Sequence, residues 1–280
     1  MHSLSSIKDL ILEATEQLGS LENARLDAEL LLCTTINYER SKLFASPETL
    51  IPDHEVSIYR DLVNRRKKGI PLSYLTGKKE FWSMEFMVNR FTLIPRPETE
   101  CLVDNVLAAI PMQSSCSIVD LGTGCGVIAV SIAVERPLCT ITATDICDKA
   151  LAVAGNNARY HAQEHIRFIK SNWYEQLQGK FDIIVSNPPY VKSTDSHLLG
   201  DGVAHEPVLA LDGGADGLLS ISKIISNAPQ YLNHGGLLII EHGYNQAHSV
   251  RALFNQMKYS GVTTCRDYAG NERVTMGRKV

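Results

Sequence analysis

The segment DIIVSNPPYV at residues 182–191 is the part of the chain with the clearest chemical content, because a strand-like run ends there at an asparagine, two prolines and a tyrosine. Each proline lacks an N–H, fixes its own φ and restricts the residue before it, so we expect Asn187 to be extended with its carboxamide directed away from the sheet. The nitrogen of an amide or an aromatic amine is a poor nucleophile because its lone pair is delocalised. The Asn187 side-chain oxygen and the Pro188 carbonyl can accept both N–H groups of such an –NH₂, while Tyr190 packs on the flat group. Most Asn-Pro sequences merely end a strand, but this combination predicts a site that orients a planar nitrogen toward an electrophile.

A glycine-rich turn, DLGTGCGV, follows the first apolar run of the second half of the chain. Gly122, Gly124 and Gly126 permit a tight turn and let a ligand approach main-chain N–H groups at the start of the next helix. The spacing is not that of a dinucleotide-binding fingerprint, which requires a further glycine where the chain has Val127. Asp145 ends the next predicted strand, where a carboxylate can accept hydrogen bonds from ribose hydroxyls. An ordinary βα turn and a helix N-cap are the plain alternatives, but together these features indicate a cofactor that contains adenosine.

Composition excludes several classes of protein. The chain has 280 residues, 44% hydrophobic and 21% charged, with a net charge of −4, as expected for a globular protein with a sizeable core. The seven cysteines are scattered without a C-x-x-C spacing and the nine histidines show no HExxH pattern, so we expect reduced thiols and no metal site. Charged residues interrupt the first twenty residues, and no later segment has the length and apolarity of a membrane span. We therefore expect a cytoplasmic protein that binds no membrane and, as a whole, no polyanion, although a local basic patch could still do so. Separately, we expect a monomer without direct nucleic-acid binding.

Periodicity divides the chain into three parts. Residues 1–77 carry the 3.6-residue apolar spacing of helices and predict a small helical domain. Residues 78–99 form a linker in which the runs at 81–88 and 91–94, separated by a turn at Asn89-Arg90, predict a β-hairpin. Residues 100–280 alternate apolar runs of strand length with helical stretches, which is typical of a parallel sheet covered by helices on both faces. The expected strands are 117–121, 140–144, 166–170, 181–186 and 236–241, and two further runs near the C-terminus, joined by a short turn, are expected to pair antiparallel.

Together these motifs carry a family resemblance. DLGTGCG, the TD at 144–145 and SNPPY resemble the class I S-adenosylmethionine-dependent methyltransferases that methylate amino groups. Over essentially the whole chain, the sequence resembles the peptide-chain release factor glutamine methyltransferases of the HemK type. The stretches that carry this closer resemblance are RLDAELLL (25–32), PLSYLTGKKEFW (71–82), LIPRPETE (93–100), SNWYEQL (171–177), HEPVLALDGGADGL (205–218) and NERVTMGR (271–278).

The resemblance implies a fold, a reaction and a cofactor. The fold would be a Rossmann-like, seven-stranded mixed sheet with a helical N-terminal domain and a hairpin linker. The reaction would move the methyl group of S-adenosylmethionine to the side-chain amide nitrogen of the glutamine in the Gly-Gly-Gln loop of class I release factors. The helical domain would grip the release factor, the protein substrate.

The resemblance also implies roles for individual residues. Asn187, Pro188, Pro189 and Tyr190 would bind the glutamine amide, with Asn187 close to the cofactor as well. Residues 96–100 would line the site. The implied cofactor residues are Gly122, Thr123, Gly124, Cys125 and Gly126 along the turn, Asp145 on the ribose and Trp173 near the adenine. Asn172, just before Trp173, stands where many members of the family have aspartate.

Two other functions are compatible with the same residues. A methyltransferase acting on the N6 amine of adenine in nucleic acid would use the same motif, with the flipped base stacked on Tyr190. The acidic pI of about 6.1 and the lack of a dedicated basic segment favour a protein substrate instead. A binding module that keeps the cofactor fold without turnover is less consistent with an intact NPPY motif.

Overall fold

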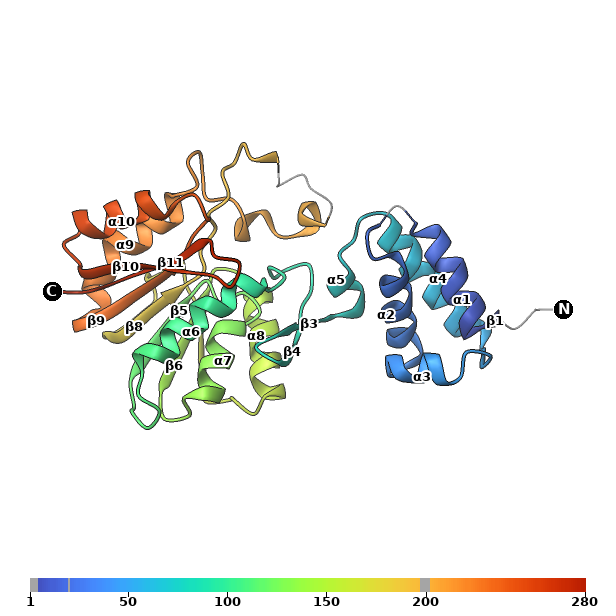
Figure 1. Ribbon diagram of the computed structural model, residues 1–280. Coiled ribbons are helices and arrows are strands. Elements are labelled where there is room, and N and C mark those ends of the chain that lie inside the picture. The colour runs from blue at the N-terminus through green and yellow to red at the C-terminus, as the bar shows by residue number, and fades with distance from the viewer. Residues whose placement is uncertain (1–4, 20, 197–201) are drawn as a thin grey trace. The chain divides into compact units, whose positions relative to one another are not determined.

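The computed structural model describes residues 5–19, 21–196 and 202–280, and these form two compact units. One comprises residues up to Lys78 together with a short segment that ends at His205, and the other comprises Lys79 onward apart from that segment. Figure 1 shows the helical unit in blue and the mixed α/β unit in green to red. Among the described residues, no helix combines the length and the apolarity that crossing a bilayer requires.

The N-terminal unit is a small helical bundle around one apolar core. Leu10, Leu31 and Tyr59, from three different helices, are almost completely buried, and the Tyr59 hydroxyl donates to the Ala28 carbonyl at 3.1 Å. Ser6 caps the first helix, because its side chain accepts a hydrogen bond from the Asp9 N–H. The elements are β1 (Ser5–Ser6), α1 (Ile7–Gln17), α2 (Ala24–Ile36), α3 (Arg40–Ala45), β2 (Leu50–Ile51), α4 (Asp53–Lys67) and α5 (Leu72–Thr76).

The larger unit is built on a seven-stranded mixed sheet with the order β10-β11-β9-β8-β5-β6-β7. The five strands from β5 to β9 are parallel to their neighbours in that group, whereas β11 runs antiparallel to both β9 and β10. The Rossmann-like fold class and the antiparallel C-terminal pair are thereby confirmed. The strands are β5 (Ser117–Leu121), β6 (Thr140–Asp145), β7 (Arg167–Lys170), β8 (Phe181–Ser186), β9 (Leu232–Glu241), β10 (Ser260–Arg266) and β11 (Glu272–Arg278).

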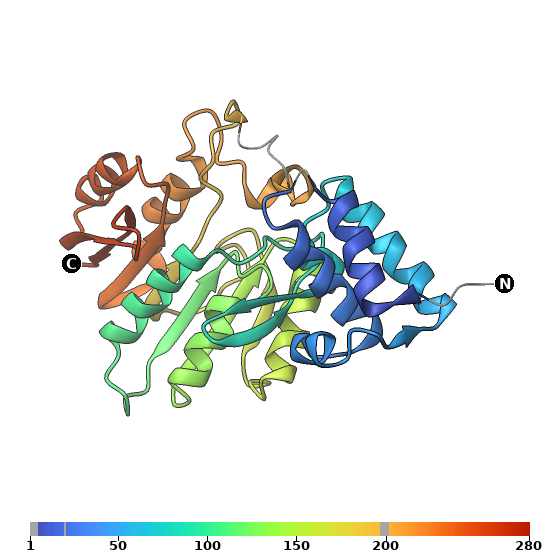
Figure 2. The same ribbon diagram turned by 45° about the vertical axis from the view of Figure 1, so that its right-hand side comes forward.

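Helices cover both faces of this sheet (Figures 1 and 2). The face carrying Leu121, Ile184 and Leu238 packs against α9 and α10, and the opposite face packs against α6, α7 and α8. The chain order reverses between β5 and β8, so a crevice opens at the carboxyl ends of these two neighbouring strands. The helices are α6 (Glu100–Ala109), α7 (Val127–Glu135), α8 (Asp148–Tyr160), α9 (Leu219–Tyr231) and α10 (Ala247–Gln256), with short 3₁₀ turns at η1 (Pro97–Thr99) and η4 (Val208–Ala210). A further 3₁₀ turn, η3 (Val203–His205), belongs to the helical unit.

The predicted hairpin exists, but its position was wrong. Its strands are β3 (Lys78–Phe81) and β4 (Met84–Met87), joined by Trp82 and Ser83, and residues 91–94 form no strand. Both turn residues have φ of 54°, which non-glycine residues rarely adopt without help from other parts of the fold. That help comes from distant residues, since the Glu100 carboxylate accepts from the Trp82 N–H at 2.8 Å and Glu135 accepts from its indole N–H at 3.0 Å.

Candidate active site

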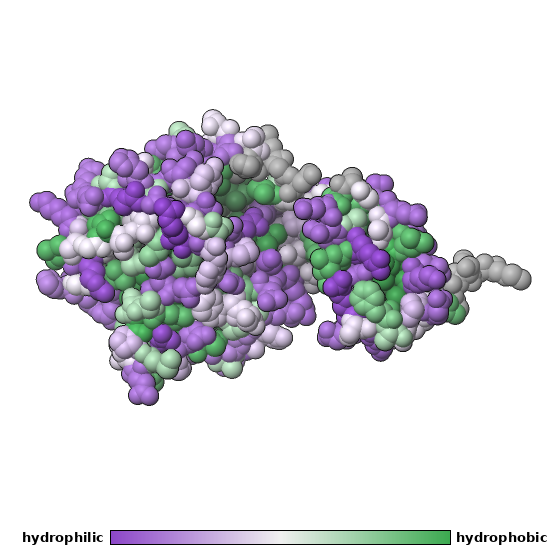
Figure 3. Space-filling view, viewed as in Figure 1, coloured by the Kyte–Doolittle hydropathy of each residue, from purple (hydrophilic) through white to green (hydrophobic). Residues whose placement is uncertain are grey.

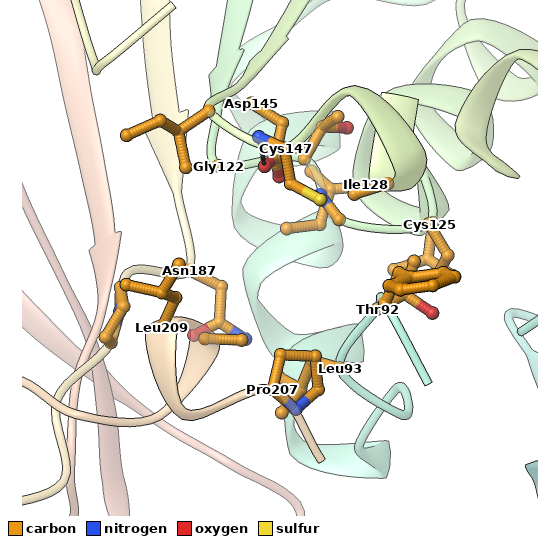
Figure 4. A pocket seen from close by; sticks show the side chains of 18 of the residues that line it. Thr92, Leu93, Gly122, Cys125, Ile128, Asp145, Cys147, Asn187, Pro207 and Leu209 are labelled. Carbon is orange, nitrogen blue, oxygen red and sulfur yellow. Dashed lines mark hydrogen bonds between the residues drawn. The ribbon is translucent and has the colours of Figure 1, made fainter. Parts of the chain in front are cut away.

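A cavity of about 460 Å³ lies within the α/β unit at the carboxyl ends of β5, β6 and β8. Figure 4 shows Asp145 and Gly122 on one side of it and Asn187, Pro207 and Leu209 across from them. These residues come from four separate segments, the turns after β5, β6 and β8 and the loop around η4. The lining includes the following residues predicted from the sequence: Arg96, Thr99, Gly122, Thr123, Gly124, Cys125, Asp145, Trp173, Asn187 and Pro189.

The remaining predicted residues, among them residues 97, 98 and 100, do not line the cavity. Pro188 is buried. Gly126 directly precedes α7, and a Cβ atom there would lie 3.0 Å from the Ala154 side chain. The Gly126 φ of 87° also favours glycine, so this residue serves close helix packing. Tyr190 directs its hydroxyl to the carboxylate of Glu241 at 3.1 Å.

The glycine turn and Asp145 form one hydrogen-bonded unit. Asp145 Oδ2 accepts from the Gly124 N–H and Oδ1 from the Cys147 N–H, each at 2.9 Å. Burial raises the pKa of Asp145, and these backbone donors oppose the rise. An ideal Cβ atom on Gly124 would meet no atom within 4 Å, so the backbone there faces open space. Asp145 thus organises the turn while its carboxylate remains part of the cavity wall.

One cysteine and one aspartate near the turn do not present reactive groups. Burial raises the pKa of the Cys125 thiol to about 12, and the Cys125 carbonyl accepts from Asn157 at 2.8 Å. Asp120 is fully buried within β5, and burial raises its pKa to about 7 although the Thr123 hydroxyl donates to it at 2.6 Å. The turn therefore offers a ligand its backbone and its shape.

The NPPY segment is supported by the loop that precedes α9. The Val191 N–H donates to the Leu211 carbonyl at 2.9 Å, and the Gly213 N–H donates to the Val191 carbonyl at 2.7 Å. Gly217 has a φ of 76°, and a Cβ atom there would lie 2.4 Å from the Tyr190 carbonyl oxygen. This close approach explains why the loop contains glycines and how it holds the segment at the cavity edge.

The Asn187 carboxamide has a defined orientation. Its Nδ2 donates to the Thr99 hydroxyl at 3.1 Å, whereas no described residue donates a hydrogen bond to its Oδ1. Among the described residues, no donor is bonded to the Pro188 carbonyl either. Two acceptors are therefore available next to the cavity, as a planar –NH₂ group requires.

Three residues that hold this site were not singled out from the sequence. Glu206, nearly buried, accepts from the Ile94 N–H at 2.9 Å and pairs with Arg96, so it joins the two loops that flank the cavity. Asn157, fully buried on α8, joins the hairpin to the glycine turn, since it also donates to the Met87 carbonyl at 2.9 Å. Glu241 ends the apolar run GLLIIE, and a lone carboxylate at the end of a buried strand is the signal that could have identified it.

Comparison with known proteins gives consistent matches over both units. The methyltransferase small domain model matches residues 99–208, and the PrmC N-terminal domain model matches residues 9–77. A release factor glutamine methyltransferase of Salmonella typhimurium is 47% identical over 95% of this chain and 96% of its own length. The Escherichia coli protein of the same name is 44% identical over the same shares, and that of Shewanella oneidensis is 39% identical over 99% and 98%.

Solved structures with lower identity share the fold. A methyltransferase from Pyrococcus furiosus superimposes with a TM-score of 0.54 at 18% identity, covering 80% of this chain and 98% of that one. A ribosomal protein L11 methylase from Lactobacillus delbrueckii gives a TM-score of 0.50 at 20% identity, with 66% and 81% covered. The architecture described above is thus that of class I methyltransferases.

Proposed function

The chain belongs to the release factor glutamine methyltransferase family, and from this premise we propose that it methylates the glutamine of the Gly-Gly-Gln motif in class I peptide-chain release factors. The methyl donor is S-adenosylmethionine and the product is N5-methylglutamine. The observation that carries the proposal is the orientation of Asn187, whose Nδ2 is bonded to Thr99 while its Oδ1 remains available as an acceptor.

In this function, the residues of the NPPY motif orient the substrate nitrogen. S-adenosylmethionine supplies a methyl group made electrophilic by the sulfonium. Asn187 Oδ1 and the Pro188 carbonyl accept the two N–H groups of the glutamine carboxamide and hold its nitrogen in line with that methyl group. The new N–C bond would form as the methyl–sulfur bond breaks, S-adenosylhomocysteine would be left, and the nitrogen would release one N–H proton to water. The protein needs no covalent intermediate for this chemistry, so its contribution is orientation.

The residues around the cavity fit the proposed cofactor. The volume of about 460 Å³ lies in the usual range for small-ligand sites, roughly 300–1,000 Å³. Asp145 supplies an acceptor for the ribose hydroxyls, and the open backbone at Gly124 leaves room for the methionine part. Trp173 packs against the glycine turn, since a Cβ atom on Gly122 would lie 3.4 Å from its ring, and it offers an apolar surface for the adenine.

Asn172 also lines the cavity, but its amide is already engaged. It donates to Glu175 at 2.6 Å and accepts from Lys223 at 3.5 Å. The Lys223 contact is long, so the Asn172 oxygen keeps acceptor capacity for the adenine amine.

The helical unit is the proposed surface for the release factor. Its exposed faces carry large apolar side chains, and Figure 3 shows green patches among the hydrophilic surface of this unit. Exposed apolar side chains of this size are more consistent with a protein partner than with a phosphate backbone. The residues are Leu12, Phe44, Leu50 and Ile58, all more than half exposed.

Family membership and the PrmC N-terminal domain do not favour methylation of nucleic acid. We further propose that the enzyme works as a monomer in the cytoplasm without binding nucleic acid itself. Light scattering tests the monomer, and binding to labelled RNA and DNA tests the absence of nucleic-acid binding.

Mass spectrometry of a purified class I release factor, incubated with the enzyme and S-adenosylmethionine, tests the main proposal. We expect a gain of one methyl group on the native Gly-Gly-Gln loop and none on a Gln→Ala variant of that loop. No gain on the native loop, with S-adenosylmethionine bound by the enzyme, would overturn the proposed substrate and retain the cofactor site.

A further inference from the structure

A chain of hydrogen bonds runs from Asn187 into the protein interior. Asn187 Nδ2 donates to Thr99 Oγ1 at 3.1 Å, and the Thr99 hydroxyl lies near enough to the Glu241 carboxylate to lower the pKa of Glu241. The Tyr190 hydroxyl donates to Glu241 Oε1 at 3.1 Å. Glu241 ends β9 and Asn187 follows β8, the neighbouring strand, while Thr99 directly precedes α6. Three elements that are far apart in the sequence thus meet behind the site.

The direction of these bonds determines which Asn187 atom faces the cavity. An asparagine side chain can turn by 180° and exchange its donor for its acceptor, so it needs a partner that accepts but does not donate. A threonine hydroxyl can do either. In its ionised form Glu241 only accepts, so it accepts a hydrogen bond from the Thr99 hydroxyl and leaves Thr99 Oγ1 as the acceptor for Asn187 Nδ2.

The burial of the Glu241 carboxylate opposes folding. Its side chain is completely buried, and burial raises its pKa to about 7. Its Oε2 has no hydrogen-bond partner among the described residues. Arg273 lowers the pKa of Glu241 through its charge, but it forms its own ion pair with Asp267 at 3.1 Å. A buried, incompletely bonded carboxylate contributes little to stability, so its presence calls for another explanation.

We propose that Thr99 and Glu241 are positioning residues for methyl transfer, which keep the Asn187 carboxamide oxygen turned toward the substrate nitrogen. This inference rests on the proposed function. Neither residue needs to touch the substrate, because both act through Asn187. The effect falls on the orientation of the nitrogen in the transition state, so turnover should suffer more than docking of the release factor.

Three single variants test the direction of the hydrogen bonds from Asn187 through Thr99 to Glu241. Thr99→Val keeps the shape and removes the hydroxyl, Thr99→Ser keeps the hydroxyl, and Glu241→Gln replaces one carboxylate oxygen by a donor. We expect Thr99→Val and Glu241→Gln to lower kcat about tenfold or more, with KM for the release factor and Kd for S-adenosylmethionine within about threefold of wild type. Thr99→Ser should stay within about threefold in kcat. Thr99→Val with wild-type kcat would overturn the inference.

A double-mutant cycle separates positioning from a merely structural role. If Thr99 acts through Asn187, the Thr99→Val change should cost about tenfold in the wild-type background and less than about threefold in an Asn187→Ala background. An equal loss in both backgrounds would refute the inference while leaving the proposed function intact. If the wild-type enzyme methylates no release factor, the proposed function fails and the inference fails with it.

Discussion

The buried Glu241 carboxylate makes a quantitative prediction about stability. Burial raises its pKa from 4.5 to about 7, so the folded state holds this proton more tightly than the unfolded state does. Its contribution to stability is complete below pH 4.5 and is lost as the pH rises through 7. One pKa unit corresponds to about 1.36 kcal/mol, and we expect about 2.5 kcal/mol of this contribution to disappear between pH 5 and pH 8.

Glu241→Gln removes this titration. From pH 5 to pH 8, the free energy of unfolding of the variant should therefore fall by about 2.5 kcal/mol less than that of the wild type. Hydrogen bonds changed by the substitution affect both pH values alike and cancel in the comparison. Asp120, whose pKa burial also raises to about 7, titrates in both proteins and cancels too.

Urea unfolding followed by tryptophan fluorescence measures this difference. Both tryptophans of the chain, Trp82 and Trp173, lie in the α/β unit, so the signal reports the unit that contains Glu241. Glu164→Gln, which removes an exposed carboxylate from the same unit, is the matched control and should follow the wild type. If the free energy of unfolding depends equally on pH in wild type and Glu241→Gln, the argument that burial raises the pKa of Glu241 is refuted.

Three further predictions concern the site. Asn187→Ala should lower kcat by about 10²-fold, roughly 3 kcal/mol of lost orientation, with nearly unchanged cofactor affinity; loss of cofactor binding with retained turnover would contradict the assigned role. Asp145→Ala should weaken S-adenosylmethionine binding by about 1–3 kcal/mol, and an unchanged calorimetric titration would count against the ribose contact. Gly217→Ala should destabilise the protein by at least about 2 kcal/mol more than Gly179→Ala in thermal unfolding, since both have positive φ but only the former clashes, with Tyr190 at 2.4 Å. Equal losses of stability in the two variants would contradict this prediction and show that the loop moves to relieve the clash.

Signals from residues close together in the sequence were sufficient to predict the strands of the sheet and the residues that line the cavity. Apolar runs of strand length and the glycine turn depend on neighbouring residues alone, so β5 and β8 lie at the predicted residues. Asn187 and Asp145 could be assigned to one site because side chains that follow parallel strands meet at the same edge of a sheet.

The hairpin shows where local signals fail. The Trp82-Ser83 turn has positive φ at two non-glycine residues and depends on the distant Glu100 and Glu135. No local sequence signal marks these two residues as a turn, so the prediction placed the turn at Asn89-Arg90. The energy that selects this turn comes from residues brought close only by folding.

The family, the fold class and the residues that face the cavity from the ends of strands could all be predicted from the residues and their spacing. Which atoms of those residues are free became visible only in the folded protein. Whether Asn187 presents its oxygen depends on Thr99, 88 residues away, and on Glu241 behind it. The direction of a hydrogen bond depends on which donors and acceptors are neighbours in the folded protein, and this cannot be read from the spacing of residues along the chain.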